Sequence, residues 1–397
     1  MITLDTLRIV INEYRQPLEN EETINREKKL PLKSKSVIVV SGVRRCGKST
    51  ILKQLFNKEE KKIFLNFEDT RLEEFELSDF EKVEKIAVSE KITCYIFDEI
   101  QNIIGWEKYV RSAHDKGFNI YITGSNASML SRELGTKLTG RHFQTELFPF
   151  SYLEFLSYTK EKEGSVSFKN YLNKGGFPEF LATNNYEYLR SLLRDIIIRD
   201  IAVRRNIRNE HTVLRLALNL MSNIGKELSY NNISKVLEIK SVRTTIDYCD
   251  FLKESYLIDF IPRFSYSIKQ QQNNPKKVYS IDTGIARANS LSFSEDYGRM
   301  LENAVFLHFR RFFQDILYYK DDQSECDFLV RKQEKIIIAA QVCWNLSEDN
   351  LKREIQGLKN AMIASGLNKG IIITFDQEDK FGEINAIPFW KWVKQDI

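Results

Sequence analysis

Near its amino-terminal end the chain reads Gly42-Val43-Arg44-Arg45-Cys46-Gly47-Lys48-Ser49, and this stretch decides the fold. It matches the pattern G-x-x-x-x-G-K-[ST] at every position. The run Val37–Val40 before it predicts a strand, and Ser49–Phe56 after it predicts a helix. Such a turn points backbone N–H groups at phosphate oxygens, and the helix N-terminus adds partial positive charge. We therefore expect ATP here, with Lys48 at the β and γ phosphates and Ser49 on Mg²⁺; the alternative is a plain strand, turn and helix.

A second expected strand ends in two acidic residues. Cys94-Tyr95-Ile96-Phe97 is mostly apolar, and Asp98 and Glu99 follow it directly. Because a magnesium ion beside such a loop needs a carboxylate at a nearby strand end, Asp98 is the candidate metal ligand. Glu99 is the candidate base that polarises the attacking water. The alternative is a helix N-terminus that carries acidic residues, which is common in itself.

Three further residues are candidates for catalysis. Ser125 and Asn126 follow the apolar run Asn119–Thr123, and either could position the water near the γ-phosphate. The sequence Gly-Ser-Asn also favours simple turns, so both interpretations stay open. Arg141 could neutralise transition-state charge in its own or in a neighbouring subunit. An arginine at a strand edge is, however, more often part of a surface ion pair.

Composition excludes several classes of protein. The net charge of +4, from 59 basic and 55 acidic residues, is too small to indicate nucleic acid by itself. Hydrophobic residues make up 42%, so the chain can bury cores and is not of the disordered class. The five cysteines are widely spaced without a CxxC, which indicates reduced thiols and argues against a disulfide framework or a zinc site. No signal segment or membrane-spanning run is evident, so we expect a cytoplasmic protein with no membrane partner.

Short apolar runs alternate with helical stretches over residues 37–147, which predicts a mostly parallel sheet covered on both faces. Residues 1–30 read as a polar helix and a charged linker, and residues 150–210 as helices broken at Gly175–Pro178. Residues 297–397 return to an α/β pattern. The expected strands are Val37–Val40, Ile63–Phe67, Thr93–Phe97, Asn119–Thr123, Phe143–Leu147, Ile316–Tyr319, Cys326–Val330, Lys335–Val342 and Gly370–Phe375.

Six stretches of the chain together resemble a known family. They are Gly42–Thr50, Phe97–Asn102, Thr123–Asn126, Leu138–Arg141, Lys174–Pro178 and Tyr279–Gly284. They look like the bacterial and archaeal AAA-type P-loop ATPases that carry a C-terminal domain of unknown function. The resemblance adds Thr50 to the nucleotide-binding stretch. It implies an α/β protein with a P-loop AAA-type ATPase core, a helical lid, a winged-helix domain and a C-terminal restriction-endonuclease-like domain.

We place the domain boundaries to fit that order. Residues 1–30 form an N-terminal helix and linker, 31–150 the ATPase core and 151–210 the helical lid. Residues 211–290 form the winged-helix domain and 291–397 the nuclease-like domain.

The winged-helix residues also suggest that fold on their own, with three helix-like segments followed by a hairpin. The segments are Thr212–Met221, Ser229–Leu237 with Ser229 as cap, Ser241–Lys253, and Tyr256–Arg263 paired with Lys277–Ile281. In a DNA-binding protein the third helix would enter the major groove and the polar loop of the hairpin would contact phosphates. The alternative is a packing or relay element, since acidic residues dilute the basic face. The expected contacts are Arg243, Thr244, Thr245, Tyr248 and Lys253 on the helix, and Lys269, Lys276 and Lys277 in the loop.

A restriction-type nuclease needs an acid on a helix, an aspartate on a strand, and an acid-x-lysine pair on the next strand. Glu302 lies on the helical stretch Leu301–Phe313, and Asp327 opens an expected strand. Gln341 stands where the second acid should be, and Cys343 where the lysine should be. Because cysteine cannot replace a cationic amine, we expect a degenerate domain without cleavage. The alternative is a non-catalytic α/β domain that binds a partner.

Three functions are compatible with these patterns. The leading hypothesis is a Mg²⁺-dependent ATPase that acts as a switch, coupling its nucleotide state to the winged-helix and nuclease-like domains. The second is an ATP-dependent enzyme that binds or cleaves DNA. The third is an interaction scaffold that binds nucleotide only for stability. A protein partner or self-association stays open in each case.

Overall fold

The computed structural model describes residues 2–15, 23–31, 34–56, 61–124, 140–291 and 296–395. The chain divides into two compact units, which we call unit 1, Met1–Phe148, and unit 2, Pro149–Ile397. The boundary lies two residues before the expected end of the ATPase core. Within the described residues, no helix is both long and apolar enough to cross a membrane.

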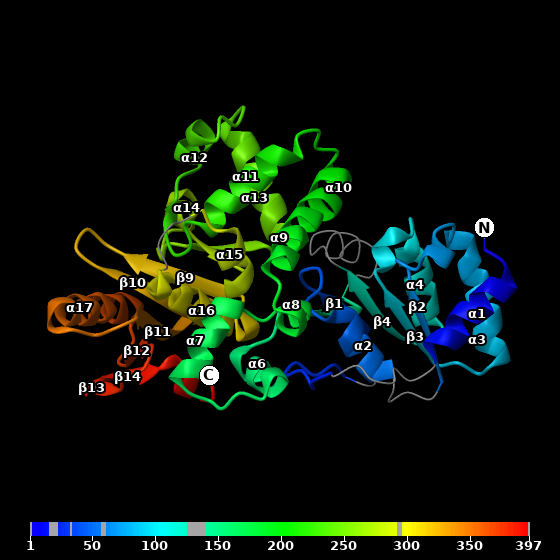
Figure 1. Ribbon diagram of the computed structural model, residues 1–397, viewed down its shortest axis with the longest axis horizontal. Coiled ribbons are helices and arrows are strands. Elements are labelled where there is room, and N and C mark those ends of the chain that lie inside the picture. Colours follow the sequence, from blue (N-terminus) through cyan, green and yellow to red (C-terminus); the bar gives the residue numbers. More distant parts are fainter. Residues whose placement is uncertain are drawn as a thin grey trace. The chain divides into compact units, whose positions relative to one another are not determined.

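Unit 1 is built on a five-stranded sheet in the order β2-β3-β4-β1-β5, with every pair parallel. Each strand agrees with its expected bounds to within one residue. The sheet brings the carboxyl ends of β1, β3 and β4 to one edge (Figure 1). The strands are β1 Val37–Ser41, β2 Lys62–Asn66, β3 Cys94–Asp98, β4 Asn119–Gly124 and β5 His142–Glu146.

Helices cover both faces of this sheet. Buried side chains of α1, α3 and α4 join alternate strand residues in one apolar core, while α2 packs on the other face. The expected helix is present, but it is amphipathic and not simply polar, since it buries Leu7, Val10 and Ile11. The helices are α1 Leu4–Tyr14, α2 Lys48–Phe56, η1 Thr70–Leu72, η2 Leu77–Asp79, α3 Phe80–Ser89, η3 Ile100–Asn102 and α4 Trp106–Asp115.

Unit 2 contains a six-stranded sheet and a three-stranded sheet. The larger has the order β13-β14-β12-β11-β10-β9, antiparallel from β9 to β11 and parallel from β11 to β14. The smaller has the order β6-β8-β7 and is antiparallel. The strands are β6 Glu227–Leu228, β7 Ile258–Pro262, β8 Lys276–Ser280, β9 Asp315–Lys320, β10 Glu325–Lys332, β11 Lys335–Cys343, β12 Gly370–Thr374, β13 Asp379–Phe381 and β14 Ile384–Pro388.

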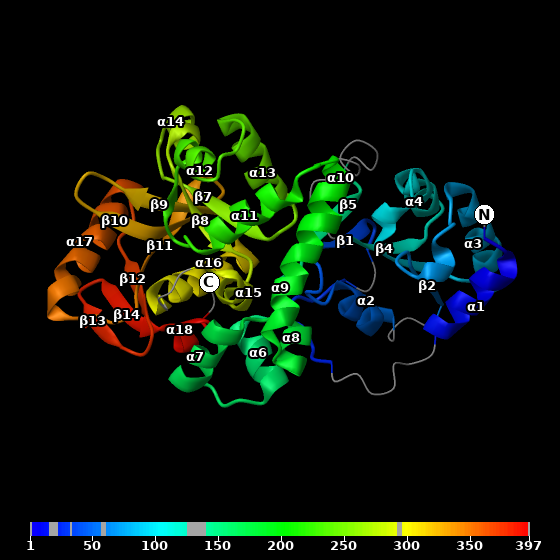
Figure 2. The same cartoon turned by 45° about the horizontal axis from the view of Figure 1, so that its top comes forward.

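The helices of unit 2 surround these sheets. A long helical run, α9 through η4 to α10, crosses the unit, and α17 lies along the larger sheet (Figure 2). The helices are α6 Tyr152–Thr159, α7 Ser165–Lys174, α8 Pro178–Thr183, α9 Tyr186–Asp195, η4 Ile196–Ala202, α10 Val203–Arg205, α11 Glu210–Met221, α12 Tyr230–Val236, α13 Val242–Glu254, α14 Ile268–Asn273, α15 Thr283–Asn289, α16 Tyr297–Phe312, α17 Glu348–Ser365 and α18 Phe389–Trp392.

Most expected elements of unit 2 are present, including the hairpin of β7 with β8 and the Ser229 cap of α12. Three features differ. The polar segment expected as a loop contains the helix α14, and the strands β13 and β14 were not expected. The chain from Pro149 to Ile397, in which we expect the lid, winged-helix and nuclease-like domains, forms one compact unit.

The two later motifs of the chain pack against each other inside unit 2. The backbone N–H of Gly176 donates to Asp282 Oδ2 at 2.6 Å, and the Gly176 carbonyl accepts from Phe150 N at 2.7 Å. A Cβ on Gly175 would lie 2.2 Å from Asp282 Oδ1, and a Cβ on Gly284 would lie 2.0 Å from the Lys174 carbonyl oxygen. These glycines are therefore required by close backbone packing.

Candidate nucleotide-binding site

The P-loop joins the end of β1 to the start of α2. Gly42 and Gly47 have φ values of 153° and 100°, in the region that glycine adopts readily. A side chain on Gly42 would also place its Cβ 2.1 Å from the Leu147 carbonyl oxygen. The loop therefore depends on glycine for both its conformation and its packing, and α2 begins at Lys48 with its N-terminus at the loop.

Lys48 is held inside this loop together with Glu99. The Lys48 ammonium donates to the carbonyl oxygens of Gly42 and Val43, each at 3.1 Å, and lies 3.6 Å from Glu99 Oε1. Gln101 donates to the other Glu99 oxygen. Glu99 itself has a left-handed backbone with φ 53°, which turns the chain sharply at the strand tip. The lysine and the expected base thus lie side by side, although 51 positions separate them.

Asp98 lies buried at the end of β3, next to β4. The hydroxyl of Thr123 donates to Asp98 Oδ1 at 2.5 Å and accepts from the Glu99 N–H at 2.8 Å. Burial first, and the Glu99 charge second, raise the pKa of Asp98 to about 6, while hydrogen bonds with the Ser49 and Thr123 side chains oppose this. Ser49 and Asp98, the two expected Mg²⁺ ligands, are therefore in contact. A buried carboxylate with so raised a pKa suits a site that receives a cation.

The remaining P-loop side chains are buried, form an ion pair or are at least partly exposed. Val43 and Cys46 are buried, and the Cys46 thiol donates to the Leu147 carbonyl at 3.3 Å. Burial raises the pKa of Cys46, so this thiol stays neutral. Arg44 forms an ion pair with Glu68 at 2.7 Å. Arg45 is exposed with φ 65°, and Thr50 is half-buried in the first turn of α2.

Two residues near the P-loop were missed by the sequence reasoning. Arg26 is buried and donates to the carbonyl oxygens of Cys46 at 2.9 Å and Phe148 at 2.6 Å. It lies in a segment that we had assigned to a charged linker. Thr123, described above, is the polar group that contacts Asp98. The position of Thr123 at the end of a strand beside β3 could have indicated this contact. We instead chose Ser125 and Asn126, which follow it.

The other expected catalytic residues are not part of this arrangement. Ser125 and Asn126 lie outside the described residues. Arg141 precedes β5, and its carbonyl accepts from Val37 N at the amino-terminal end of β1, opposite the P-loop. Its side chain pairs with Asp115 at 2.5 Å and is half-exposed. Arg141 therefore lies at the end of the sheet opposite the P-loop, and its catalytic role stays a prediction.

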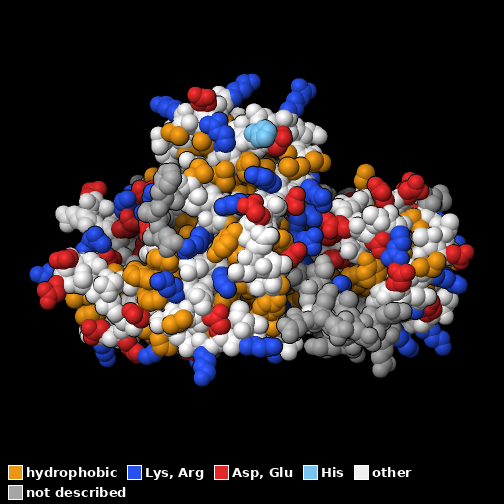
Figure 3. Space-filling model, viewed as in Figure 1, with side chains coloured by type: hydrophobic (Ala, Val, Ile, Leu, Met, Phe, Trp, Pro, Cys, Tyr) orange, Lys and Arg blue, Asp and Glu red, His pale blue; other side chains and the backbone are white. Residues whose placement is uncertain are grey.

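The expected winged-helix contacts need two corrections. Thr245 is fully buried, so it cannot face a DNA groove. Lys277 is also buried, on β8, and is not part of an exposed loop. Arg243 is exposed and pairs with Asp247 at 3.1 Å, and Lys253 pairs with Asp259 at 3.0 Å. On the face drawn in Figure 3, acidic and basic side chains are interspersed in both units.

The residues expected in a nuclease-like site do converge in unit 2. Gln341 Oε1 accepts from the backbone N–H of Asp327 at 3.1 Å, and Asp327 Oδ1 lies 2.9 Å from Lys277 Nζ. Glu302 Oε1 lies 3.3 Å from the same ammonium. Burial raises the pKa of Glu302 to about 7. Cys343 is not part of this contact set, and its thiol donates to the Asn345 carbonyl. The ammonium beside Asp327 and Glu302 is that of Lys277, which the sequence pattern did not place there.

Comparisons with known proteins agree with the geometry of unit 1. The AAA domain family matches residues 34–156, and a domain of unknown function, DUF8612, matches residues 165–296. The uncharacterized protein MJ1544 of Methanocaldococcus jannaschii is 37% identical over 98% of this chain and 94% of its own length. An uncharacterized protein of Haemophilus influenzae is 29% identical over 90% of this chain and 94% of its own length.

Among solved structures, the chain is similar to the Walker-type ATPase of Pyrococcus abyssi. The identity is 15%, with a TM-score of 0.42 over 72% of this chain and 93% of that chain. The sequence relatives cover nearly the full length of both proteins, so both units are parts of a shared architecture.

Proposed function

This chain belongs to the same family as MJ1544 of Methanocaldococcus jannaschii and carries an AAA-type P-loop ATPase domain, and on that premise we propose that it hydrolyses ATP as a switch. The observation that supports hydrolysis is the meeting of Lys48 and Glu99 at 3.6 Å beside the pair Ser49 and Asp98. A loop that only binds nucleotide needs the lysine but no neighbouring carboxylate.

Each residue has a separate task in this proposal. Backbone N–H groups of the P-loop and the N-terminus of α2 bind the phosphates, and Lys48 stabilises the charge that develops on the γ-phosphate. Ser49 and Asp98 hold Mg²⁺, which supplies further neutralisation of the phosphate oxygens. Glu99 orients the attacking water and accepts its proton. Gln101 donates to the carboxylate of Glu99 and so fixes its orientation.

The switch would act through the chain at Phe148, where unit 1 ends. Arg26 joins the Cys46 carbonyl in the P-loop to the carbonyl of Phe148, the last residue of unit 1. A change in the P-loop on nucleotide binding would therefore reach the chain where unit 2 begins. Because residues 149–397 are one compact unit, we propose that unit 2 responds as a whole. Within it we propose a winged-helix element from α11, α12, α13 and the small sheet, and a nuclease-like element from the larger sheet.

The test is phosphate release with Mg²⁺ and ATP, measured next to ATP binding. Glu99→Gln keeps the shape of the side chain but removes the base, so turnover should fall by about 10²- to 10⁴-fold with ATP binding retained. Glu73→Gln, an exposed glutamate of the same unit, is the matched control and should turn over at the wild-type rate. Equal turnover in Glu99→Gln and the wild type would remove Glu99 from the mechanism.

A scaffold that binds nucleotide only for stability gives a different result in the same experiment. Its phosphate release would not exceed that of Lys48→Ala, while ATP would still raise the unfolding midpoint of the wild type. That outcome would replace the ATPase switch with the scaffold.

A further inference from the structure

Gln101 lies in the single 3₁₀ turn η3, which follows β3 beside the P-loop. Glu99 precedes this turn with a φ of 53°, so the chain turns sharply at the tip of the strand. The side chain of Gln101 thereby reaches back to that of Glu99, and its Nε2 group donates to Glu99 Oε2. This contact holds Glu99 in the proposed ATPase, but it uses only one end of the Gln101 amide.

The turn that carries Gln101 is held by both of its neighbours. Ile100, before it, is fully buried in the apolar core of unit 1. Asn102, after it, donates from its backbone N–H to the Glu99 carbonyl at 3.2 Å and from its side chain to the Phe67 carbonyl at 3.2 Å. The backbone at Gln101 is therefore well fixed, as a residue with a geometric task requires.

The orientation of the Gln101 amide follows from its partner. An ionised carboxylate only accepts hydrogen bonds, so the NH₂ end of the amide must face Glu99 and the oxygen must point elsewhere. That oxygen, Gln101 Oε1, is buried and has no hydrogen-bond partner among the residues that the structure describes. A buried acceptor without a donor is unfavourable, so a side chain that served packing alone would be better as leucine or methionine.

This unpartnered oxygen lies close to the expected catalytic carboxylate. The oxygen and nitrogen of one amide are only about 2 Å apart, because both are bonded to the same carbon. Since Gln101 Nε2 contacts Glu99 Oε2, Gln101 Oε1 must lie within about 5 Å of that carboxylate oxygen. One water molecule can donate to two acceptors at such a separation.

The two oxygens of the Glu99 carboxylate face different groups. Oε2 accepts from Gln101, whereas Oε1 lies 3.6 Å from the ammonium of Lys48. In the proposed ATPase Lys48 binds the γ-phosphate, and Glu99 Oε1 is the oxygen on the side of that lysine. Glu99 Oε1 is therefore the oxygen that accepts the proton of the attacking water, while Gln101 keeps the carboxylate in place from the other side.

We propose that Gln101 is a further catalytic residue of the ATPase, whose Oε1 accepts one hydrogen bond of the attacking water while Glu99 accepts the other. This inference rests on the proposed function of the same site. A water molecule has two O–H groups, and when two fixed acceptors hold both of them its lone pair has a defined direction. The pair Glu99 and Gln101 thus aims the water at the γ-phosphorus.

The bond changes are those of hydrolysis, and Gln101 exchanges no proton. The water oxygen forms a bond to the γ-phosphorus, and the bond from that phosphorus to the bridging oxygen breaks with its electron pair on ADP. The proton of the water goes to Glu99. The products are ADP and phosphate, with no change of oxidation state.

The first test is the steady-state kinetics of Gln101→Met in the full-length protein. Methionine keeps the length of the side chain but removes both ends of the amide, so kcat should fall by about 10- to 100-fold with KM for ATP within about twofold. Gln54→Met is the matched control, because Gln54 is a half-buried glutamine of the same unit whose amide donates to the Ile24 carbonyl. A kcat of Gln101→Met equal to that of the wild type would overturn the proposal.

The second test measures binding of a transition-state analogue, ADP with aluminium fluoride and Mg²⁺, next to binding of ATP. Gln101→Met should weaken the analogue by about the same factor as kcat, while ATP binding changes less than about twofold. In a Glu99→Ala background Gln101 has no carboxylate to act through, and Gln101→Met should still weaken the analogue at least fivefold. Loss of the effect in that background would mean that Gln101 only orients Glu99, and would overturn its catalytic role.

A second variant covers the case that Gln101→Met does not fold. Gln101→Glu has the same size but cannot donate to Glu99 and repels it, so kcat should again fall at least tenfold, and a wild-type kcat would overturn the proposal. The same assays separate this role from the ATPase itself. Phosphate release by the wild type no faster than by Lys48→Ala would overturn both, whereas wild-type turnover that both Gln101 variants retain would overturn only the role of Gln101.

Discussion

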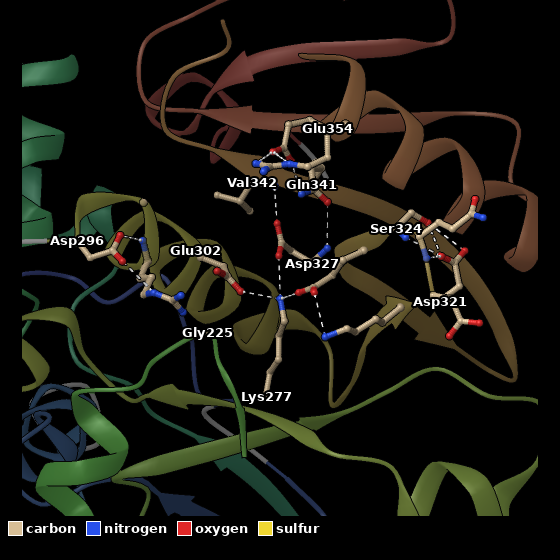
Figure 4. A pocket seen from close by; sticks show the side chains of 17 residues that line it. Gly225, Lys277, Asp296, Glu302, Asp321, Ser324, Asp327, Gln341, Val342 and Glu354 are labelled. Atoms are coloured by element: carbon tan, nitrogen blue, oxygen red, sulfur yellow. Dashed lines mark hydrogen bonds and ion pairs between the residues drawn. The ribbon is translucent and has the colours of Figure 1, made fainter. Parts of the chain in front are cut away.

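The P-loop site of unit 1 and a pocket of about 580 Å³ around Lys277 in unit 2, which we call the Lys277 pocket, both combine a buried lysine with carboxylates (Figure 4). They hold the lysine differently. Lys48 contacts two neutral carbonyl oxygens at 3.1 Å and one carboxylate at 3.6 Å. Lys277 contacts three carboxylates, all within 3.3 Å. Since charged acceptors bind an ammonium more strongly than carbonyls do, Lys48 can turn to an arriving phosphate. Lys277 is instead a charge held in place by its acidic neighbours.

The largest expected effect separates the two sites by exchanging each lysine for methionine. Lys48→Met should lower ATP turnover at least a hundredfold, because no ammonium then stabilises the charge that develops on the γ-phosphate. Lys277→Met should leave ATP turnover within about twofold of the wild type but destabilise unit 2 by about 3–5 kcal/mol, since it leaves buried carboxylates unpaired. The measurements are phosphate release and urea unfolding. Loss of ATP turnover in folded Lys277→Met would mean that the two sites are not independent.

The sites also differ in how much of each could be predicted from sequence. The P-loop, Asp98 and Glu99 are local patterns, because a parallel sheet brings every strand tip to the same edge. The Lys277 pocket needs β8, α16 and β10 to meet, and no short motif contains them. One local signal existed, since Lys277 and Tyr279 lie two positions apart on β8 and both contact Glu302. The neighbouring polar segment led us to place Lys277 on an exposed loop instead.

The same contrast holds for the fold. Some elements follow from short stretches of sequence, whereas others depend on contacts between residues that are far apart in the chain. Strand positions in unit 1 follow from short apolar runs, whereas β13 has three mostly exposed residues, and β14 buries alternate residues but ends in a proline. The amphipathic side of α1 was visible in the spacing of Leu4, Leu7 and Ile11, but the charged residues between them led us to expect a polar helix. The close packing of Gly176 against Phe150 likewise depends on the tertiary structure, although the glycine pair itself was recognised.

The second effect tests whether the packing of Lys174–Pro178 against Tyr279–Gly284 and Phe150 stabilises unit 2. Gly176→Ala would place a Cβ 2.2 Å from the carbonyl oxygen of Phe150, a backbone atom that cannot rotate away. We expect a loss of about 3 kcal/mol in the free energy of unfolding, the upper end for overpacking. Gly298→Ala is the control, because its Cβ meets nothing nearer than 3.4 Å and lies in α16. Tryptophan fluorescence reports on unit 2, which holds Trp344, Trp390 and Trp392. Equal stability of the two variants would contradict the packing described here.

The third effect is a pH dependence of the free energy of unfolding. It arises at Asp282, where the two later motifs pack against each other. Burial raises the pKa of Asp282 to about 6, above the ordinary value of about 3.9, although Gly176 and Ile285 donate to it and Arg311 lies nearby. A raised folded-state pKa contributes stability that is complete below about pH 4 and is lost as the pH rises through 6. The wild type should therefore lose up to about 3 kcal/mol relative to Asp282→Asn between pH 4 and pH 8.

The informative quantity is the change with pH of the difference in unfolding free energy between the two proteins. The size of the difference at one pH is not informative, because the asparagine changes the hydrogen bonds of Gly176 and Ile285 equally at every pH. Urea unfolding of both proteins at pH 4, 5, 6, 7 and 8 measures it. Parallel curves for the two proteins would mean that Asp282 has the same pKa in the folded and unfolded states, so that the effect of its burial is fully compensated.

The smallest expected effect is that of replacing Arg141. This replacement tests whether the nucleotide site of unit 1 is complete within a single chain. Its ion pair with Asp115 is half-exposed and lies at the end of the sheet opposite the P-loop. Arg141→Ala should therefore change the free energy of unfolding by less than about 1 kcal/mol, and ATP turnover per chain by less than about twofold. Asp115→Ala removes the same ion pair from the other side and should give the same small change. If Arg141→Ala alone lowers turnover a hundredfold, and wild-type turnover per chain rises with protein concentration, the arginine acts on the nucleotide of a neighbouring subunit. In that case the P-loop site would also be assembled from distant parts, and the contrast with the Lys277 pocket would be smaller than the single chain indicates.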